Sequence, residues 1–397
     1  MRPHFDSLAF LTFPNPDSAH NSLRLIAWVM LSLLSVLPVA CGGGNSSGGP
    51  PPPPSAKAAL YLSTGLSPNS VLTYVFDTGT VTVGSPTPVA GPPAGIDMKI
   101  YPGGKFLYIS DFNSGSVYAY SINQSTGALT AVSGSPFSFP GHLGNGGPIA
   151  IDPAGKFLFS SNAAGAIVCF TINAQTGVLM PGVAQVITDN NQPIYLLVDP
   201  TGKFLIASNH SDSSGGGFSV FSIDGTSGTL AAVSGSPFTF FQNTGPQQIV
   251  LNSGGTVLYA ALSNAKQVAA LDFDPATGKL TSIQGSPYPA GILPQSLALP
   301  PTGTFLYAGN NGAGSVSTYA VDTSTGGLTD KGEVQVGNPT FLDIDASGQF
   351  LIIAGESSNT LSIYKIDSTT GTITLSNNTN LPAGSGVRSM SQLLPLQ

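Results

Sequence analysis

Few residues in the long C-terminal part of the chain could carry out acid–base chemistry. Beyond position 56 the only histidine, glutamate and arginine residues are His142, His210, Glu333, Glu356 and Arg388. Hydrolysis of an ester needs a donor that stabilises the developing oxyanion and a histidine or carboxylate that moves a proton. These five residues are far apart in sequence, so only the fold could bring a reactive pair together.

Other catalytic and metal-binding motifs are missing from the sequence. Neither Cys nor His residues have the spacing of zinc ligands, and no GxSxG segment stands between a strand and a helix. Paired aspartates occur in "DFD" (272–274) and "DID" (343–345). Asp274 and Asp345 recur at a turn position, so hydrogen bonds within turns explain them. We therefore expect no cofactor and no metal.

An internal repeat predicts the elements that must position the candidate residues. Six similar segments have central glycines 45–53 residues apart: "YPGGKFLY" 101–108, "DPAGKFLF" 152–159, "DPTGKFLI" 199–206, "NSGGTVLY" 252–259, "PPTGTFLY" 300–307 and "DASGQFLI" 345–352. A short apolar run precedes each copy. An alternating strand follows and ends in Asn or Asp, with Gly four residues later. Four short strands per unit at this period are typical of a β-propeller blade.

The Gly-Lys pair in some copies superficially resembles a phosphate-binding loop. In other copies Lys is replaced by Thr256, Thr304 or Gln349, and no helical pattern follows. A phosphate-binding loop needs a helix N-terminus and a different glycine spacing. Asp-Pro-x-Gly instead favours a tight turn between the first two strands of a blade.

The two ends of the repeat array predict a closed ring. Residues 58–86 supply a partial unit with strands two, three and four but no first strand. The segment "GVRSMSQLLP", 386–395, alternates and has the character of the missing first strand. We therefore predict an all-β, seven-bladed β-propeller over residues 57–397, in which the C-terminal strand completes the N-terminal blade.

The second strands read "YISD", "FSSN", "IASN" and "YAGN", which resemble the repeat of YVTN-type propellers. Residues 57–397 resemble the seven-bladed lactonase-like propellers, whose members include 6-phosphogluconolactonase-like proteins and muconate-lactonizing enzymes. This resemblance implies a site at one end of the central channel. The candidates that could converge there are Arg388, His210, Glu356 and Asp111. The family's enzymes use several basic residues at this place, whereas this domain has one arginine.

The N-terminus resembles a bacterial lipoprotein signal peptide. Arg24 precedes an apolar run of signal-peptide length, residues 25–40, and "LPVAC" resembles a lipobox that ends at Cys41. We expect a signal peptide at 1–40, lipidation of Cys41 and a Gly/Ser/Pro tether at 41–56. An ordinary signal peptide with an incidental cysteine is the alternative. Either predicts an extracytoplasmic protein, anchored to the envelope or secreted.

Composition narrows the possible partners. The net charge is −7 and the basic residues of the domain are scattered singly, so we expect no nucleic-acid partner and membrane contact only through Cys41. Two functions remain open. The first is a monomeric binding or scaffold module that docks an unknown protein or small molecule on one end of the ring. The amides expected to line this docking face are Gln192, Gln247, Gln248, Gln295, Asn162, Asn209 and Asn310. The second is a lactonase-type hydrolase.

Overall fold

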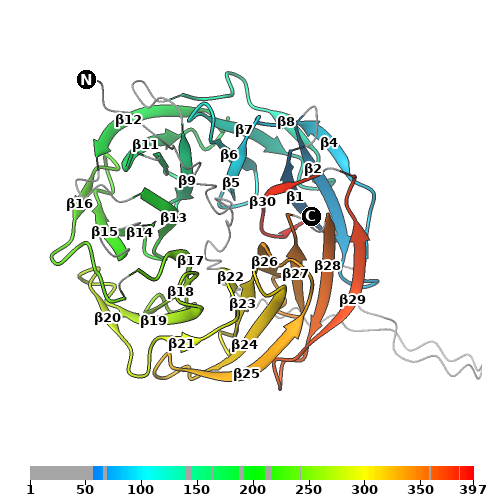
Figure 1. The fold of residues 1–397 in the computed structure, drawn as a ribbon. Helices are drawn as coiled ribbons and strands as arrows, with labels where there is room; N and C mark the ends of the chain where they lie inside the picture. Colours follow the sequence, from blue (N-terminus) through cyan, green and yellow to red (C-terminus); the bar gives the residue numbers. More distant parts are fainter. Residues whose placement is uncertain are drawn as a thin grey trace, which may run out of the picture.

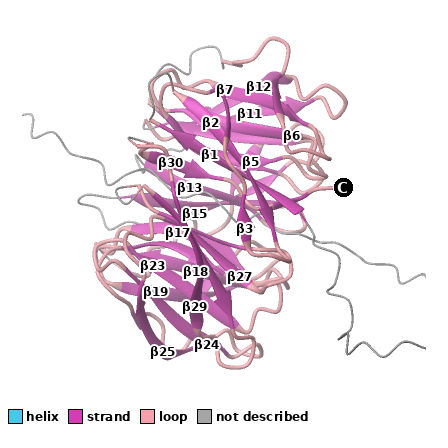
Figure 2. Cartoon of the chain, turned by 90° about the vertical axis from the view of Figure 1, so that its right-hand side faces the viewer, coloured by secondary structure: helices cyan, strands magenta, loops and turns pink. Residues whose placement is uncertain are grey.

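The computed structural model describes residues 57–397 except 66–68, 139–144, 163, 187–191, 211–216, 242, 357–358 and 384. Every regular element in this part is a β-strand (Figure 2). The strands form seven separate sheets arranged in a ring (Figure 1). The predicted signal peptide, tether and Cys41 lie outside the described residues. No helix long and apolar enough to cross a membrane occurs among the described residues.

Blades 2 to 4 each run outward from their first strand. Blade 2 holds β5 (Gly95–Ile100), β6 (Phe106–Asp111), β7 (Val117–Ile122) and β8 (Leu129–Ala131). Blade 3 holds β9 (Gly146–Ile151), β10 (Phe157–Asn162), β11 (Ala166–Ile172) and β12 (Leu179–Val186). Blade 4 holds β13 (Gln192–Val198), β14 (Phe204–His210), β15 (Gly217–Ile223) and β16 (Leu230–Ala232).

Blades 5 to 7 repeat this order, and blade 5 carries a fifth short strand. Blade 5 holds β17 (Pro246–Leu251), β18 (Val257–Leu262), β19 (Gln267–Phe273), β20 (Leu280–Ser282) and β21 (Tyr288–Pro289). Blade 6 holds β22 (Pro294–Ala298), β23 (Phe305–Asn310), β24 (Ser315–Val321) and β25 (Leu328–Gln335). Blade 7 holds β26 (Phe341–Ile344), β27 (Phe350–Ala354), β28 (Thr360–Ile366) and β29 (Ile373–Asn380).

Blade 1 is assembled from both ends of the described chain. Its N-terminal strands are β1 (Lys57–Thr64), β2 (Ser70–Asp77), β3 (Thr82–Val83) and β4 (Thr87–Ala90). The C-terminal strands β30 (Val387–Met390) and β31 (Leu394–Pro395) both pair with β1, and β30 is the innermost strand. The prediction that the C-terminal strand completes the N-terminal blade is confirmed.

The core of the protein is divided among the seven interfaces between neighbouring blades, which we call seams. Each seam has its own cluster of buried apolar side chains. Adjacent residues of a strand serve different seams because their side chains point to opposite faces of the sheet. Leu107 packs toward blade 1, whereas Tyr108 packs toward blade 3. Alternation along the second strands therefore holds each blade to both neighbours.

Tyrosine side chains of the second strands bridge four seams by hydrogen bonds. Each hydroxyl donates to the carbonyl oxygen of the glycine in the next blade's Asx-x-x-x-Gly turn at 2.9–3.0 Å: Tyr61 to Gly127, Tyr108 to Gly177, Tyr259 to Gly326 and Tyr307 to Gly371. These glycines have positive φ, between 74° and 78°. A side chain on Gly371 would also collide with Phe305, so the turn fits closely against the preceding blade.

The Gly-Lys segments are structural turns between first and second strands, as predicted. In blade 4 the carboxylate of Asp199 accepts the backbone N–H groups of Lys203 and Phe204, at 2.8 and 2.7 Å. The N–H of Gly202 donates to the Asp199 carbonyl oxygen at 2.9 Å. These three backbone N–H groups donate to Asp199, so they are not available to bind a phosphate.

Candidate functional site

Six of the seven innermost strands have a register irregularity close to their first residue. In blade 1 the pairs Val387–Thr64 and Ser389–Ser63 leave Arg388 as an extra residue. The corresponding residues in the other blades are Ile96, Gly147 with Pro148, Ile194, Gln247 with Gln248, and Gln295. Bulges re-aim side chains and are frequent next to functional sites. Because the innermost strands surround the axis of the ring (Figure 1), the bulges mark one axial end, which we call the bulge end.

Arg388 is the only cation in this set of bulge residues. Its side chain is half-buried, and its Nε is fully buried without a hydrogen-bond partner. The guanidinium lies over Gly65: a methyl group on Gly65 would stand 3.2 Å from Nε. No salt bridge to Arg388 occurs in the described part of the chain. An arginine fork with a buried, unused donor is suited to a carbonyl or anionic oxygen of a ligand.

Glu356 lies at the same end of the neighbouring blade. It follows β27, and its backbone N–H donates to the hydroxyl of Thr340, just before β26, at 3.1 Å. The residue is half-buried, and its carboxylate forms no ion pair with any described residue. Since blade 7 packs directly on blade 1, the structure brings Glu356 and Arg388 to adjacent blades at the bulge end.

The other candidates are placed differently. Asp111 ends β6 at the bulge end but is completely buried. Its carboxylate accepts the N–H of Ala94 at 2.7 Å and both the N–H and hydroxyl of Ser114, at 3.0 and 2.6 Å. Asp111 therefore fixes two loops and has little capacity left for a substrate. His210 is the last residue of β14 at the same end, and its side chain lies outside the description, as does the whole of His142.

The amide side chains expected to form a docking face are mostly inside the protein. The buried members of that set are Gln247, Gln248, Gln295, Asn162, Asn209 and Asn310. Their bonds are internal: Gln248 accepts the N–H of Leu297 in the next blade at 2.8 Å, and Asn310 donates to Ser317 at 2.8 Å. The expectation that these six amides are exposed on a docking face is wrong, because their side chains are buried.

A buried ion pair near the axis was missed in the sequence. Lys99 Nζ lies 3.0 Å from Asp97 Oδ1, and both side chains are at most 5% exposed. The other carboxylate oxygen accepts the N–H of Ile149 in blade 3 at 2.9 Å, and Nζ stands 4.8 Å from the ring centroid of Tyr195 in blade 4. Burial raises the pKa of Asp97, against the opposing charge of Lys99. The available signal was two charges in the otherwise apolar segment "GIDMKI".

The described residues offer no group of three His, Cys, Asp or Glu side chains placed as metal ligands. Of the candidates whose side chains are described, Arg388 and Glu356 are the two at the bulge end that are not completely buried. This arrangement can hold and polarise a carbonyl group, and a nearby carboxylate can accept a proton from water.

Comparisons with known proteins agree with the architecture. A curated 6-phosphogluconolactonase of Formosa agariphila is 41% identical over 86 residues, which cover 21% of this chain and 23% of that protein. The periplasmic gluconolactonase of Pseudomonas aeruginosa superposes with a TM-score of 0.72 at 17% identity, covering 86% of this chain and 99% of the other. A Lactobacillus plantarum protein gives 0.69 at 19% identity, covering 86% and 100%. At such identities the structural likeness establishes the fold.

The family assignment comes from the sequence profile of the repeats. The family described as "Lactonase, 7-bladed beta-propeller" matches residues 131–239, 183–291 and 233–389, which together span most of the ring. The predicted resemblance is thereby confirmed at the level of family and fold. The chain belongs to the lactonase family of seven-bladed β-propellers.

Proposed function

We propose that this protein is an extracytoplasmic lactone hydrolase whose site lies at the bulge end. The observation that carries the proposal is Arg388: a half-buried arginine on a bulge of the innermost strand, with a buried Nε that no described residue uses. The family, the gluconolactonase neighbour and the matched stretch of the 6-phosphogluconolactonase support a lactone as substrate.

The chemistry requires two roles that these residues can fill. Arg388 donates hydrogen bonds to the lactone carbonyl oxygen and stabilises the negative charge that develops as water adds to the carbonyl carbon. Glu356 accepts a proton from that water. The acyl–oxygen bond of the ring then breaks, the ring oxygen takes up the proton, and the product is a hydroxy acid. Asp111 positions the neighbouring loops and does not contact the reacting atoms in this scheme.

The proposed location follows from the N-terminus. Residues 25–40 have the length of a signal-peptide core and immediately precede Cys41. A periplasmic neighbour of the same fold is compatible with export. We propose that lipidated Cys41 anchors the ring to the bacterial envelope. Metabolic labelling with a fatty-acid probe tests this point: Cys41→Ser should abolish labelling, and unchanged labelling would contradict it.

An activity assay tests the hydrolase. Purified protein is offered a panel of lactones in a pH-stat, with Arg388→Ala, Arg388→Lys and Glu356→Gln as variants. Lys279→Ala is the control, because Lys279 is exposed in a turn at the opposite end. We expect Arg388→Ala to lower kcat by about 10²–10³-fold, and Glu356→Gln by about 10²-fold or more. Equal rates for wild type and Arg388→Ala across the panel would contradict the proposal.

A binding module is the second candidate. The unpaired guanidinium of Arg388 would equally hold a ligand that carries a carbonyl or carboxylate without cleaving it. Calorimetric titration of the same lactones separates the two functions. Binding that Arg388→Ala abolishes, without turnover of any lactone, would establish the module and dismiss the hydrolase.

A further inference from the structure

Two large apolar side chains are exposed together at the bulge end. Ile292 and Leu293, which we call the apolar ledge, are 47% and 40% exposed. They form the end of the loop that enters β22 in blade 6. The other strongly exposed large apolar side chains of the described chain, Met180 and Leu375, lie on the strands β12 and β29 at the outside of the ring. Among the strongly exposed large apolar side chains of the described chain, those of the apolar ledge are thus the two at the bulge end.

The backbone of the ledge is held firmly despite its exposure. The carbonyl oxygen of Leu293 accepts the N–H of Asn311 at 2.9 Å, and that of Ile292 accepts the N–H groups of Gly312 and Ala313 at 3.0 and 3.2 Å. Leu293 has a φ of 54°, in the left-handed region that disfavours leucine. Strained residues of this kind persist only where the surrounding structure fixes them, and they are concentrated at functional sites.

Two glycines allow the loop to pack so closely. A methyl group on Gly312 would stand 2.8 Å from Ile292 Cγ2 and 3.1 Å from Leu293 Cδ1, so both ledge side chains lie over Gly312. A methyl group on Gly291 would stand 2.6 Å from Asn310 Cγ. The fold therefore holds two apolar side chains at fixed positions in solvent. An unstrained polar loop would avoid both the strain and the exposed apolar surface.

The ledge is continuous with the ring of bulges. Pro294 follows Leu293 directly, and Gln295 is the bulge residue of blade 6, with its Oε1 accepting the side-chain N–H of Asn311 at 2.7 Å. Among the bulge residues Arg388 is the only charged one, and Ile194 adds another partly exposed apolar side chain. The bulge end also carries Glu356 and the exposed Lys266, whose carbonyl oxygen accepts the N–H of Ala290 at 2.8 Å, and within this surface the ledge is an apolar patch.

We infer that the lactone bound here carries an apolar substituent, such as an alkyl chain, that lies against Ile292 and Leu293. The inference rests on the proposed function for the lactone ring itself, which Arg388 would hold. A lactone with many hydroxyl groups or a phosphate would place strongly hydrated groups against the ledge, and their desolvation would go uncompensated. An alkyl chain instead gains from leaving water.

A chain-length series tests the inference. γ-Lactones with substituents from methyl to octyl are compared with gluconolactone in the hydrolysis assay. We expect kcat/KM to rise by about three- to fourfold for each methylene that reaches the ledge. Leu293→Asn is the key variant, because asparagine tolerates the left-handed conformation and removes the apolar group. It should keep or raise the melting temperature, leave the methyl-substituted lactone unaffected, and lower kcat/KM for the octyl lactone by tenfold or more.

The control is Leu375→Asn on the outer strand β29, which should change none of these rates. A binding experiment makes the inference separable from the proposed function. An alkyl-substituted lactam, which resists hydrolysis, is titrated by calorimetry into wild type and Leu293→Asn. If lactones are hydrolysed with no dependence on chain length, the inference is overturned and the hydrolase stands. If no lactone is hydrolysed but the lactam binds only when Leu293 is present, the ledge is supported and the hydrolase fails. Identical lactam affinities for both proteins would overturn the ledge.

Discussion

The seam between blades 7 and 1 is built differently from the seam between blades 6 and 7. We call the former the closing seam, because the C-terminal segment passes from blade 7 into blade 1 beside it. Between blades 6 and 7, Tyr307 donates to Gly371 across the seam at 2.9 Å. At the closing seam Ile352 occupies the position of that tyrosine. Hydrogen bonds that cross it include Asn377 Nδ2 to the Val81 carbonyl oxygen and the Leu393 N–H to Asp343 Oδ2, both at 2.9 Å.

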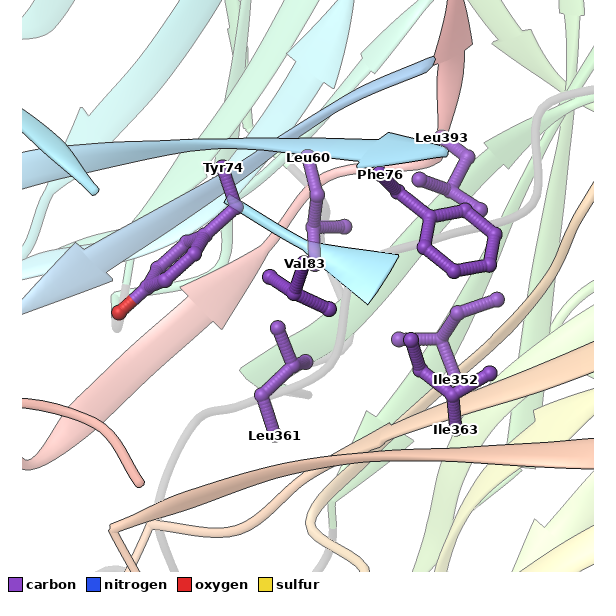
Figure 3. Close-up of a pocket in the computed structure, with 8 residues that line it drawn as sticks. All are labelled: Leu60, Tyr74, Phe76, Val83, Ile352, Leu361, Ile363 and Leu393. Atoms are coloured by element: carbon purple, nitrogen blue, oxygen red, sulfur yellow. The ribbon is translucent and has the colours of Figure 1, made fainter. Parts of the chain in front are cut away.

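The closing seam also contains a small cavity. The cavity has a volume of about 10 Å³ and is lined by eight side chains, among them Leu60, Tyr74 and Leu361 (Figure 3). The Tyr74 hydroxyl, which points away from the other labelled side chains in this view, is buried and unpartnered. Six buried side-chain atoms of the described residues lack a hydrogen-bond partner, and four belong to blade 1: Thr73 Oγ1, Tyr74 Oη, Arg388 Nε and Ser389 Oγ.

Among the described residues, buried polar groups are least satisfied in blade 1, where the two ends of the described chain meet without a covalent bond. Each buried unpaired polar atom costs about 1–3 kcal/mol. Blade 1 therefore depends on strand pairing and on buried apolar side chains such as Met390. The same blade carries Arg388, so its unmet hydrogen-bonding capacity coincides with the candidate site.

Removing the C-terminal strands should have the largest effect on the closing seam. Deletion of residues 386–397 takes away the fully buried side chains of Val387, Met390 and Leu393. Losses of about 2–5 kcal/mol for each side chain together rival a typical total stability of about 5–15 kcal/mol. We expect an aggregated protein with no cooperative melting transition in calorimetry. A shortened chain that melts like the intact one would refute the role of β30 in closing the ring.

Loss of a single bond across the closing seam should have an intermediate effect. Asp343→Ala leaves the buried N–H of Leu393 without its acceptor, which should lower the free energy of unfolding by about 1–3 kcal/mol. Gln248→Ala removes the corresponding bond to Leu297 in the seam that Tyr259 also bridges. Urea unfolding should show the larger loss for Asp343→Ala, together with faster proteolysis of the C-terminal segment. Equal losses would mean that the closing seam is no weaker.

Two tyrosine substitutions sharpen the contrast further. Tyr307→Phe removes a satisfied hydroxyl and should destabilise the protein by about 0.5–1.5 kcal/mol. Tyr74→Phe removes an unpartnered one and should be neutral or stabilising. Both proteins are compared by urea unfolding. Similar destabilisation by the two variants would show that the Tyr74 hydroxyl has a partner after all.

The smallest expected effect is on stability at acid pH, and it arises in the Asx-x-x-x-Gly turns. Hydrogen bonds from the Ser324 hydroxyl and N–H lower the pKa of Asp322 to about 2 from 3.8. Because the folded-state pKa is the lower one, its stabilisation is complete above about pH 4 and is lost as the pH falls toward 2. Blades 2 and 3 have uncharged Asn123 and Asn173 at this position. The melting temperatures of wild type and Asp322→Asn should therefore differ most at pH 5 and converge near pH 2; a constant difference would exclude this origin.

Most of the fold could be predicted because its signals are local. Turn residues such as Asp199 and Gly202 recur in each unit, and strand alternation sets the order of strands. The outer strands were less predictable: in blade 5 the segment after β20 pairs with β19 a second time, as β21. The tyrosine bridges also escaped prediction, because their acceptors lie 64–69 residues away in the next blade.

The candidate site could be predicted only in outline. The position of Arg388 in the closing strand followed from the repeat, and its catalytic role stays a prediction. That Gly65 supports the guanidinium depends on a contact between the two ends of the chain. Asp111 shows the limit of residue type as evidence, because a carboxylate that caps loops and one that is available for catalysis look alike in a sequence. The exposure of the apolar ledge could not be predicted from the sequence, because an apolar pair in a loop can be either buried or exposed.

The bulges have a consequence for how this protein can change. An extra residue in a bulge stands opposite no single residue of the adjoining strand, so pairing does not dictate its identity. At the partly exposed bulge residues Arg388 and Ile194, a substitution can change the surface of the bulge end while the ladders and the apolar seams stay as they are. The chemistry of that surface can therefore diverge between related rings well before their architecture does.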